Sequence, residues 1–405
     1  MTRAAIFTLD ATTGGVPALA HAVYDVLARA GHAPSLVYRS TEATAGLGRA
    51  ALLRHLATTP VVRAATLNGL PSRAVAAYPL PPRWQYGTLG LARADVRAPI
   101  AAVVSGSSHV GLARARSGRP YVLWTATKYG DEIAARADGG DAWAARLLRD
   151  PDWPHLEAQE RLVYERATVA LVTSPHTRAR LVAAWPHLAG RIRHVFHPVD
   201  TTRFAPASDA ADPPYVLMAA RLRDPRKNAG LLVRAFARIH ATVPSLRLVM
   251  AGDDPPADLV ALADTLGVKD RVMFAGHVDR DALVALHQRA MLFVLPSRQE
   301  GLGIAVEEAM SCGVPVISTR CGGPEDLVDD GRTGLLVPND DERALAGALA
   351  ALTGDPARCR AMGQAARERA TAWFSHARVA GELHAAFAEA FGDVFTATSA
   401  HATAE

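Results

Sequence analysis

Residues 296–323 read PSRQEGLGIAVEEAMSCGVPVISTRCGG, and the rest of the chain is organised around them. The apolar run 291–295 predicts a strand that leads into a Pro-Ser turn and then a Gly-x-Gly turn. A helix over 302–312 follows, Gly313 ends it, and residues 314–318 predict the next strand. A strand, a glycine turn and a helix in this order form an anion site, because backbone amides approach a ligand there and the helix start carries positive partial charge.

The length and composition of the chain predict two globular domains. At 405 residues it is too long for one ordinary core, and 49% hydrophobic with 21% charged residues excludes a disordered chain. No apolar run reaches the length of a membrane span, and residues 1–9 predict a first strand, not a secretion signal. The three cysteines show neither disulfide nor metal-ligand spacing, so we expect a cytoplasmic protein.

Both halves of the chain repeat an apolar strand, a loop and an amphipathic helix, which predicts a parallel, doubly wound α/β sheet in each half. The expected strands of the first half are 4–9, 35–38, 100–104, 121–125 and 169–173. Those of the second half are 215–220, 246–251, 272–274, 291–295, 314–318 and 335–337. The polar stretch 201–214 contains three prolines, predicts an interdomain linker and thus implies a cleft between two domains.

Ligands of open α/β sheets bind at the carboxyl ends of the strands, so the loops that follow the strands hold the candidate residues of the first half. These candidates are Gly14, Gly15, His109, Thr127 and Lys128. Each also has a plain structural interpretation: a lone Gly-Gly fits a tight turn, and a single histidine after a strand often caps a loop.

Residues 44–98 are the least regular part of the sequence. Two arginines and three leucines over 49–56 predict a basic amphipathic helix, and 61–70 predicts a second helix. We expect these helices to cover the sheet, with an acceptor- or membrane-facing surface as the alternative. Although residues 1–200 hold 23 lysines and arginines against 14 acids, the chain has no zinc pattern, basic tail or aromatic RNA-binding motif, so we expect no nucleic acid.

Two cations leave the strand 215–220 at its carboxyl end. Arg221 and Lys227, together with the helix start after Gly303, would bind a diphosphate. Only three of the 44 basic residues are lysines, so a lysine at 227 indicates a need for a compact point charge. A solvated basic loop is the alternative interpretation.

Carboxylates flank the glycine turn on both sides. Glu308 could accept hydrogen bonds from a ribose diol, with Glu307 as the competing candidate, and Glu300 would point toward the group attached to the phosphate. No His-x-x-x-His pattern occurs, and we expect no metal and no cofactor. Arg221, Lys227 and helix amides would then handle the charge on a leaving diphosphate.

The motif from Glu300 to Glu308 resembles the Glu-x7-Glu motif of the retaining, metal-independent glycosyltransferases of family 4. Its context, PSRQEGLG followed by EAMSCGVPVI, matches as well. Residues 221–228, RLRDPRKN, resemble the phosphate-binding arginine and lysine of that family. Further landmarks match at Gly14-Gly15-Val16, at 197–200 (HPVD) and at 373–375 (WFS).

The resemblance implies the GT-B fold, two Rossmann-like doubly wound parallel-sheet domains that face each other across a cleft. Residues 1–205 would form the acceptor-side domain, 206–374 the nucleotide-sugar domain, and 375–395 a helix that crosses back. The implied reaction moves a sugar from a UDP- or GDP-sugar to a hydroxyl acceptor with retention of anomeric configuration. The acceptor could be a glycan, a lipid-linked sugar or a small molecule, and peripheral membrane contact stays open.

The resemblance also assigns roles to single residues. Arg221 and Lys227 would bind the diphosphate, Glu308 the ribose and Glu300 the donor sugar. The turn and the base site would add Gly301, Leu302, Gly303, Ile304, His277 and Val278. Many members carry a histidine after the strand 121–125, where this chain has Ala126, so His109 is its candidate replacement. The candidate catalytic residues are therefore Glu300, His109, Lys227 and Arg221.

Two other functions stay compatible with the same residues. A nucleotide-sugar epimerase also uses two such domains but needs no acceptor. A non-catalytic subunit that binds nucleotide sugars or carbohydrates would explain the missing histidine. A dehydrogenase is disfavoured, because neither half has the dinucleotide glycine fingerprint with an acidic residue at the expected distance.

Overall fold

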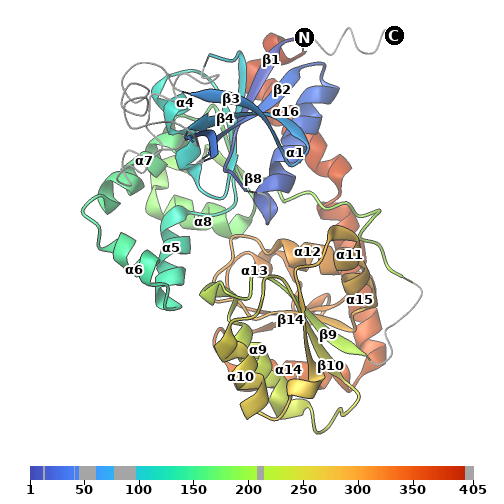
Figure 1. Ribbon diagram of the computed structural model, residues 1–405. Helices are drawn as coiled ribbons and strands as arrows, with labels where there is room; N and C mark the ends of the chain where they lie inside the picture. The colour runs from blue at the N-terminus through green and yellow to red at the C-terminus, as the bar shows by residue number, and fades with distance from the viewer. Residues whose placement is uncertain (12–13, 41, 45–60, 77–96, 208–213, 397–405) are drawn as a thin grey trace. The chain divides into compact units, whose positions relative to one another are not determined.

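The computed structural model of the protein describes residues 1–11, 14–40, 42–44, 61–76, 97–207 and 214–396. The described residues form two compact units, each built on its own sheet (Figure 1). The first unit comprises described residues of Met1–Gly130, Leu147–Pro198 and Ala377–Glu405, and the second those of Asp131–Arg146 and Val199–His376. No helix in the described ranges is long and apolar enough to cross a membrane.

The sheet of the first unit has eight strands among the described residues, in the order β3-β4-β2-β1-β5-β6-β7-β8. The strands are β1 (Arg3–Phe7), β2 (Ala33–Ser40), β3 (Val62–Leu67), β4 (Leu70–Ala76), β5 (Ile100–Ser105), β6 (Val122–Thr125), β7 (Val169–Val172) and β8 (Ile192–His194). All neighbours pair in parallel except β3 with β4. The chain reverses its direction of strand addition between β1 and β5, where open α/β sheets bind ligands.

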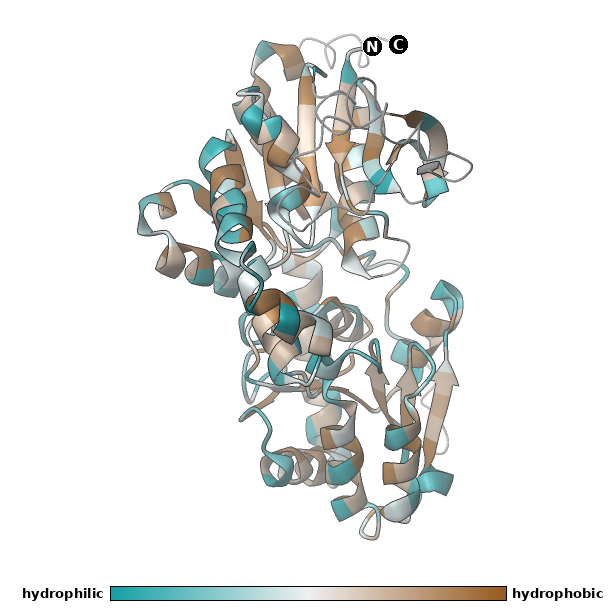
Figure 2. Cartoon of the chain, turned by 60° about the vertical axis from the view of Figure 1, so that its left-hand side comes forward, coloured by the Kyte–Doolittle hydropathy of each residue, from teal (hydrophilic) through white to brown (hydrophobic). Residues whose placement is uncertain are grey.

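Helices cover both faces of this sheet. They are α1 (Gly15–Arg29), α4 (Leu112–Arg116), α7 (Trp153–Arg166), α8 (Pro175–Ala184), α16 (His376–Phe391) and α17 (Asp393–Thr396). Alternate residues of β1 enter opposite cores: Ile6 joins α1 and α16, whereas Phe7 joins α4, α7 and α8. Because both faces are buried there, the central strands β1, β5, β6 and β7 are mostly apolar, whereas β3 and β8 carry exposed polar residues; Figure 2 colours the chain by hydropathy.

The second unit holds a wholly parallel sheet in the order β11-β10-β9-β12-β13-β14. Its strands are β9 (Tyr215–Ala219), β10 (Arg247–Ala251), β11 (Val272–Gly276), β12 (Leu292–Leu295), β13 (Val316–Thr319) and β14 (Gly334–Val337). Its helices after β9 are α9 (Ala229–Ile239), α10 (Ala257–Thr265), α11 (Arg280–Arg289), α12 (Ile304–Ser311), α13 (Pro324–Leu327), α14 (Glu342–Thr353) and α15 (Pro356–Trp373). In this sheet the direction of strand addition reverses between β9 and β12. Two doubly wound α/β sheets are thus confirmed.

One predicted helix is wrong. Residues 61–70 contribute to an antiparallel hairpin, β3 and β4, whose turn is Asn68-Gly69 with φ of 52° and 79°. Asn-Gly supplies two residues that tolerate positive φ, which a two-residue hairpin turn needs. The dipeptide is the signal that the helix prediction overlooked. The basic helix predicted over 49–56 lies outside the described residues.

The predicted linker begins as packed structure. Phe204 is fully buried in the second unit, and its amide donates to the carbonyl of Asp200. Residues 208–213 lie outside the described residues, so only the first part of the linker is visible. The predicted domain boundary at 205/206 stays a prediction.

Candidate active site

The reversal of strand order in the second unit brings two predicted loops together. The loop after β9 carries Arg221 and Lys227, and the loop after β12 carries Glu300. Both loops leave the carboxyl edge of neighbouring parallel strands, and open α/β sheets bind their ligands in a crevice at this edge, where the strand order reverses.

An ion pair joins these two loops. Lys227 Nζ lies 2.5 Å from Glu300 Oε1, and the Ser297 hydroxyl donates to the same oxygen at 2.7 Å. The side chains are only 14% and 9% exposed. Burial raises the pKa of Glu300, but the nearby ammonium and the hydrogen bonds outweigh it and hold that pKa below its ordinary value. Glu300 is therefore ionised at neutral pH and opposes the charge of Lys227.

Arg221 lies at the exposed rim of the same turn. Its guanidinium pairs with Asp224 at 2.9 Å, while its side chain stays 59% exposed. Asp224 also caps the short helix Pro225–Lys227 by accepting from the Arg226 amide. A ligand in the crevice can therefore reach Arg221 without breaking the turn.

The glycine turn before α12 is fixed by close backbone approach. Gly303 caps α12 with φ of 97°, and a Cβ at Gly323 would stand 2.2 Å from Leu302 Cα. The Glu300 amide donates to the Cys321 carbonyl, and the Gly323 amide donates to the Glu300 carbonyl. The first amides of α12 have no carbonyl partner within the helix, so the turn directs donors to the crevice.

Glu308 and Glu307 differ in access. Glu307 is fully buried, whereas the Glu308 side chain is 9% exposed and its carboxylate lies 3.7 Å from Arg280 Nη1. Burial raises the pKa of Glu308 to about 7, partly offset by Arg280, and raises that of Glu307 well above its ordinary value. The geometry favours Glu308 over Glu307 as the carboxylate that meets a ligand.

His287 was not identified from the sequence, although it borders Glu308. Its Nε2 lies 3.8 Å from Glu308 Oε2, and its ring packs between Phe204 and Phe293. It is fully buried, and burial lowers its pKa to about 3, so the ring is neutral. A single histidine in the last turn of a helix is no sequence motif, so nothing in the sequence selected His287.

The predicted base site lies at the same edge but further along the sheet. His277 and Val278 follow β11, which is separated from β9 by β10. His277 is exposed and Val278 half-buried. Their role stays a prediction.

In the first unit, the loops after β1 and β5 lie side by side. Gly14 caps α1 with φ of 83° and is exposed, as a ligand-facing turn requires, and Gly15 starts the helix. A Cβ at Gly106, after β5, would come 3.9 Å from Val16. These loops flank the point at which the strand order of the first unit reverses.

Both ring nitrogens of His109 have hydrogen-bond partners within the first unit. It is 1% exposed, its Nε2–H donates to the Leu156 carbonyl at 2.9 Å, and Nδ1 accepts from the Ser107 hydroxyl at 2.6 Å. Burial lowers its pKa to about 4. Both ring nitrogens are engaged within the unit, so the geometry gives no support to His109 as a catalyst or sugar ligand.

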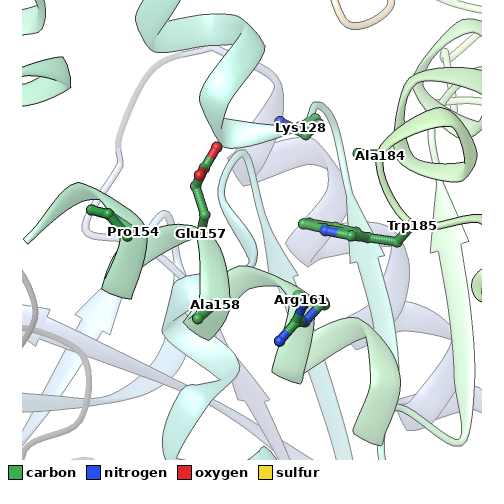
Figure 3. Close-up of a pocket in the computed structure, with 7 residues that line it drawn as sticks. All are labelled: Lys128, Pro154, Glu157, Ala158, Arg161, Ala184 and Trp185. Atoms are coloured by element: carbon green, nitrogen blue, oxygen red, sulfur yellow. The ribbon is translucent and has the colours of Figure 1, made fainter.

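Thr127 and Lys128 occupy different surroundings. Thr127 is buried in a loop whose Ala126 carbonyl accepts from Thr173 and Thr177. Lys128 borders a cavity of about 350 Å³ between α7 and the end of α8 (Figure 3). The cavity is lined by Lys128, Pro154, Glu157, Ala158, Arg161, Ala184 and Trp185. Lys128 Nζ lies 5.9 Å from the centre of the Trp185 ring, so this cavity combines charge with an aromatic face.

The described residues hold no group of three His, Cys, Asp or Glu side chains placed to bind a metal ion. The three cysteines are buried thiols that form no disulfide, and burial raises the pKa of each to about 11 or 12.

Two mostly parallel α/β units of this topology define the GT-B fold of glycosyltransferases. A sucrose-phosphate synthase from Thermosynechococcus elongatus has the same fold, with a TM-score of 0.76 over 96% of this chain and 99% of its own, at 24% identity. Residues 200–369 match the family model of the glycosyl transferases group 1. The second unit therefore carries a domain of that family.

Curated relatives point the same way. A GDP-mannose-dependent alpha-(1-6)-phosphatidylinositol monomannoside mannosyltransferase of Mycolicibacterium smegmatis is 36% identical over 225 residues, 51% of this chain and 58% of its own length. A D-inositol 3-phosphate glycosyltransferase of the same organism is 34% identical over 306 residues, 71% of this chain and 66% of its own length. The chain thus spans less than two thirds of either relative.

The pKa of Glu308 predicts how stability depends on pH. A folded value of about 7 above an ordinary 4.5 means that the folded state holds the proton more tightly, so this stabilisation is present below pH 4.5 and lost as pH rises through 7. Between pH 5 and pH 7.5, the free energy of unfolding of the wild type should therefore fall by about 2 kcal/mol more than that of Glu308→Gln. Urea denaturation at both pH values measures this. Equal losses in the two proteins would show that Glu308 ionises normally.

Proposed function

We propose that the protein is a retaining glycosyltransferase that moves a hexosyl group from a UDP- or GDP-sugar to a hydroxyl acceptor without a metal ion. The observation that carries the proposal is the Lys227–Glu300 pair, 2.5 Å apart at the crevice between β9 and β12. It lies in a domain of the glycosyl transferases group 1. An ammonium, a carboxylate and the start of a helix together suit a ligand with phosphates and hydroxyls.

The diphosphate is held by Arg221, Lys227 and the amides of Leu302, Gly303 and Ile304. Lys227 is mostly shielded from water, so its attraction to a phosphate is stronger than in bulk solvent. Arg221 reaches the same turn from its exposed rim. These groups also stabilise the charge that develops as the nucleoside diphosphate leaves, which is why the reaction proceeds without a metal.

The hydroxyl groups of the donor are bound by the two carboxylates. Glu308 accepts from the ribose diol, and hydrogen bonds to its charged form lower its raised pKa on binding. Glu300, already ionised beside Lys227, accepts from the transferred sugar. His277 and Val278 border the base.

Transfer takes place on the face of the sugar that the diphosphate leaves. The acceptor hydroxyl attacks from that side, and its proton passes to the departing phosphate oxygen, so the new bond keeps the anomeric configuration. Catalysis then rests on Lys227, Arg221 and Glu300 and needs no histidine base, in agreement with the engaged ring of His109.

The first unit contributes the acceptor side, with Gly14, Gly15, Thr127 and Lys128. The names of two relatives mention inositol 3-phosphate and a phosphatidylinositol mannoside. The first acceptors to test are therefore phosphorylated polyols and their lipid-linked forms, each with GDP-mannose and with UDP-sugars.

Removing Lys227 or Glu308, the two side chains proposed to bind the nucleotide of the donor, should abolish most of the transfer activity. Lys227→Ala and Glu308→Ala each delete a charge-assisted contact, so kcat/KM for the donor should fall by at least about 30-fold, or about 2 kcal/mol. Lys269→Ala is the matched control, because Lys269 is 58% exposed and pairs only at 3.5 Å with Asp264. Full activity in both site variants would overturn the proposal.

Metal independence and retention have their own test. Transfer should continue unchanged in excess EDTA, because protein cations and amides carry the charge of the leaving group. Proton NMR of the product should show the anomeric configuration of the donor sugar. Loss of activity on chelation with recovery on adding Mg²⁺, or an inverted product, would contradict this mechanism.

A further inference from the structure

A segment from the first half of the sequence packs with the second unit. Helices α5 (Tyr129–Asp138) and α6 (Ala142–Leu148) follow the loop of Lys128, and their residues 131–146 belong to the second unit by their contacts. The segment Asp131–Arg146 is called the arm here. It touches the turn that presents Lys227, at two separate points.

The first contact is an ion pair from α5. Glu132 Oε1 lies 3.3 Å from Arg226 Nη2, and the Arg226 side chain is only 6% exposed. Arg226 also donates from Nε and Nη2 to the Asp224 carboxylate, at 3.1 and 2.8 Å, and from Nη1 to Gln299 Oε1 at 3.1 Å. One buried guanidinium thus ties the arm to the loops after β9 and β12.

The second contact is steric. A Cβ at Gly139 would stand 2.7 Å from Pro225 Cβ and 3.3 Å from the Pro225 carbonyl carbon. The φ of Gly139 lies outside the left-handed region, so the backbone itself accepts alanine there. The arm can therefore lie this close to the turn only because residue 139 has no side chain.

The opposite side of the turn is fixed as well. The Arg298 amide donates to the Arg226 carbonyl at 2.7 Å, and its guanidinium donates to the Pro225 carbonyl at 3.1 Å. The turn therefore lies between the arm and the loop after β12. Lys227, the next residue, takes its direction from that position.

We propose that the arm is a positioning element for the donor site, with Glu132 and Gly139 as positioning residues that fix the turn carrying Lys227. The proposal rests on the proposed function in one respect, that Lys227 binds the donor diphosphate.

Gly139→Ala and Glu132→Gln test this role. In the free protein, the amides of residues 226–228 should exchange hydrogen at least about tenfold faster in both variants, because the turn loses one of its two supports. The dissociation constant for UDP or GDP, measured by calorimetry, should rise by about tenfold or more, while kcat at saturating donor changes less. Matched controls are Gly190→Ala, where a Cβ meets nothing within 4 Å, and Asp138→Asn, on the exposed face of α5.

The outcomes separate this proposal from the proposed function. If the amides of residues 226–228 exchange at the wild-type rate in both variants, the positioning role is overturned, whatever the nucleotide affinity. Faster exchange with unchanged nucleotide affinity also overturns it, because the turn would then not govern the donor. If the wild type binds neither UDP nor GDP, the proposed function fails, and the exchange rates alone decide whether the arm holds the turn. If the free energy of global unfolding falls by as much as the faster exchange implies, the effect is purely structural, and the positioning role is overturned as well.

Discussion

A buried ammonium–carboxylate pair, Lys227 with Glu300, is the interaction on which the candidate site depends. Burying two charges costs several kcal/mol of hydration, which the pair recovers only with good geometry and added hydrogen bonds. Here Ser297 supplies such a bond and Arg226 holds the turn. A pair that contributes little net stability but joins two loops 73 residues apart is better explained by a ligand that both loops bind.

The architecture explains why the charges meet there. In each unit the strand order reverses beside the first strand, and open α/β sheets bind their ligands at such a point. The second unit fills its crevice with cations, carboxylates and a glycine-capped helix. The first unit has glycine turns at this point and a separate cavity beside Lys128, with Arg161 and Trp185 on its walls. Charge chemistry is thus concentrated where a diphosphate would bind.

Sequence patterns were sufficient to predict most of the local structure, that is, the strands, helices and loops. The predicted strands, the helix after Gly303 and the loops of Lys227 and Glu300 follow from apolar runs and glycine positions, and the structure has them within a few residues of prediction; the edge strand β8 was not predicted. The hairpin at Asn68-Gly69 was missed through a turn signal that was present. The contacts of Arg226 with Glu132 and of Glu308 with His287 could not be predicted, because tertiary packing alone brings such distant residues together.

A crystal structure of the protein with UDP or GDP tests the central claim most directly. The account predicts that diphosphate oxygens lie within hydrogen-bonding distance, about 3 Å, of Lys227 Nζ and of the first amides of α12, with the ribose on Glu308. A nucleotide bound elsewhere, with the Lys227–Glu300 pair closed and its crevice empty, would contradict the account.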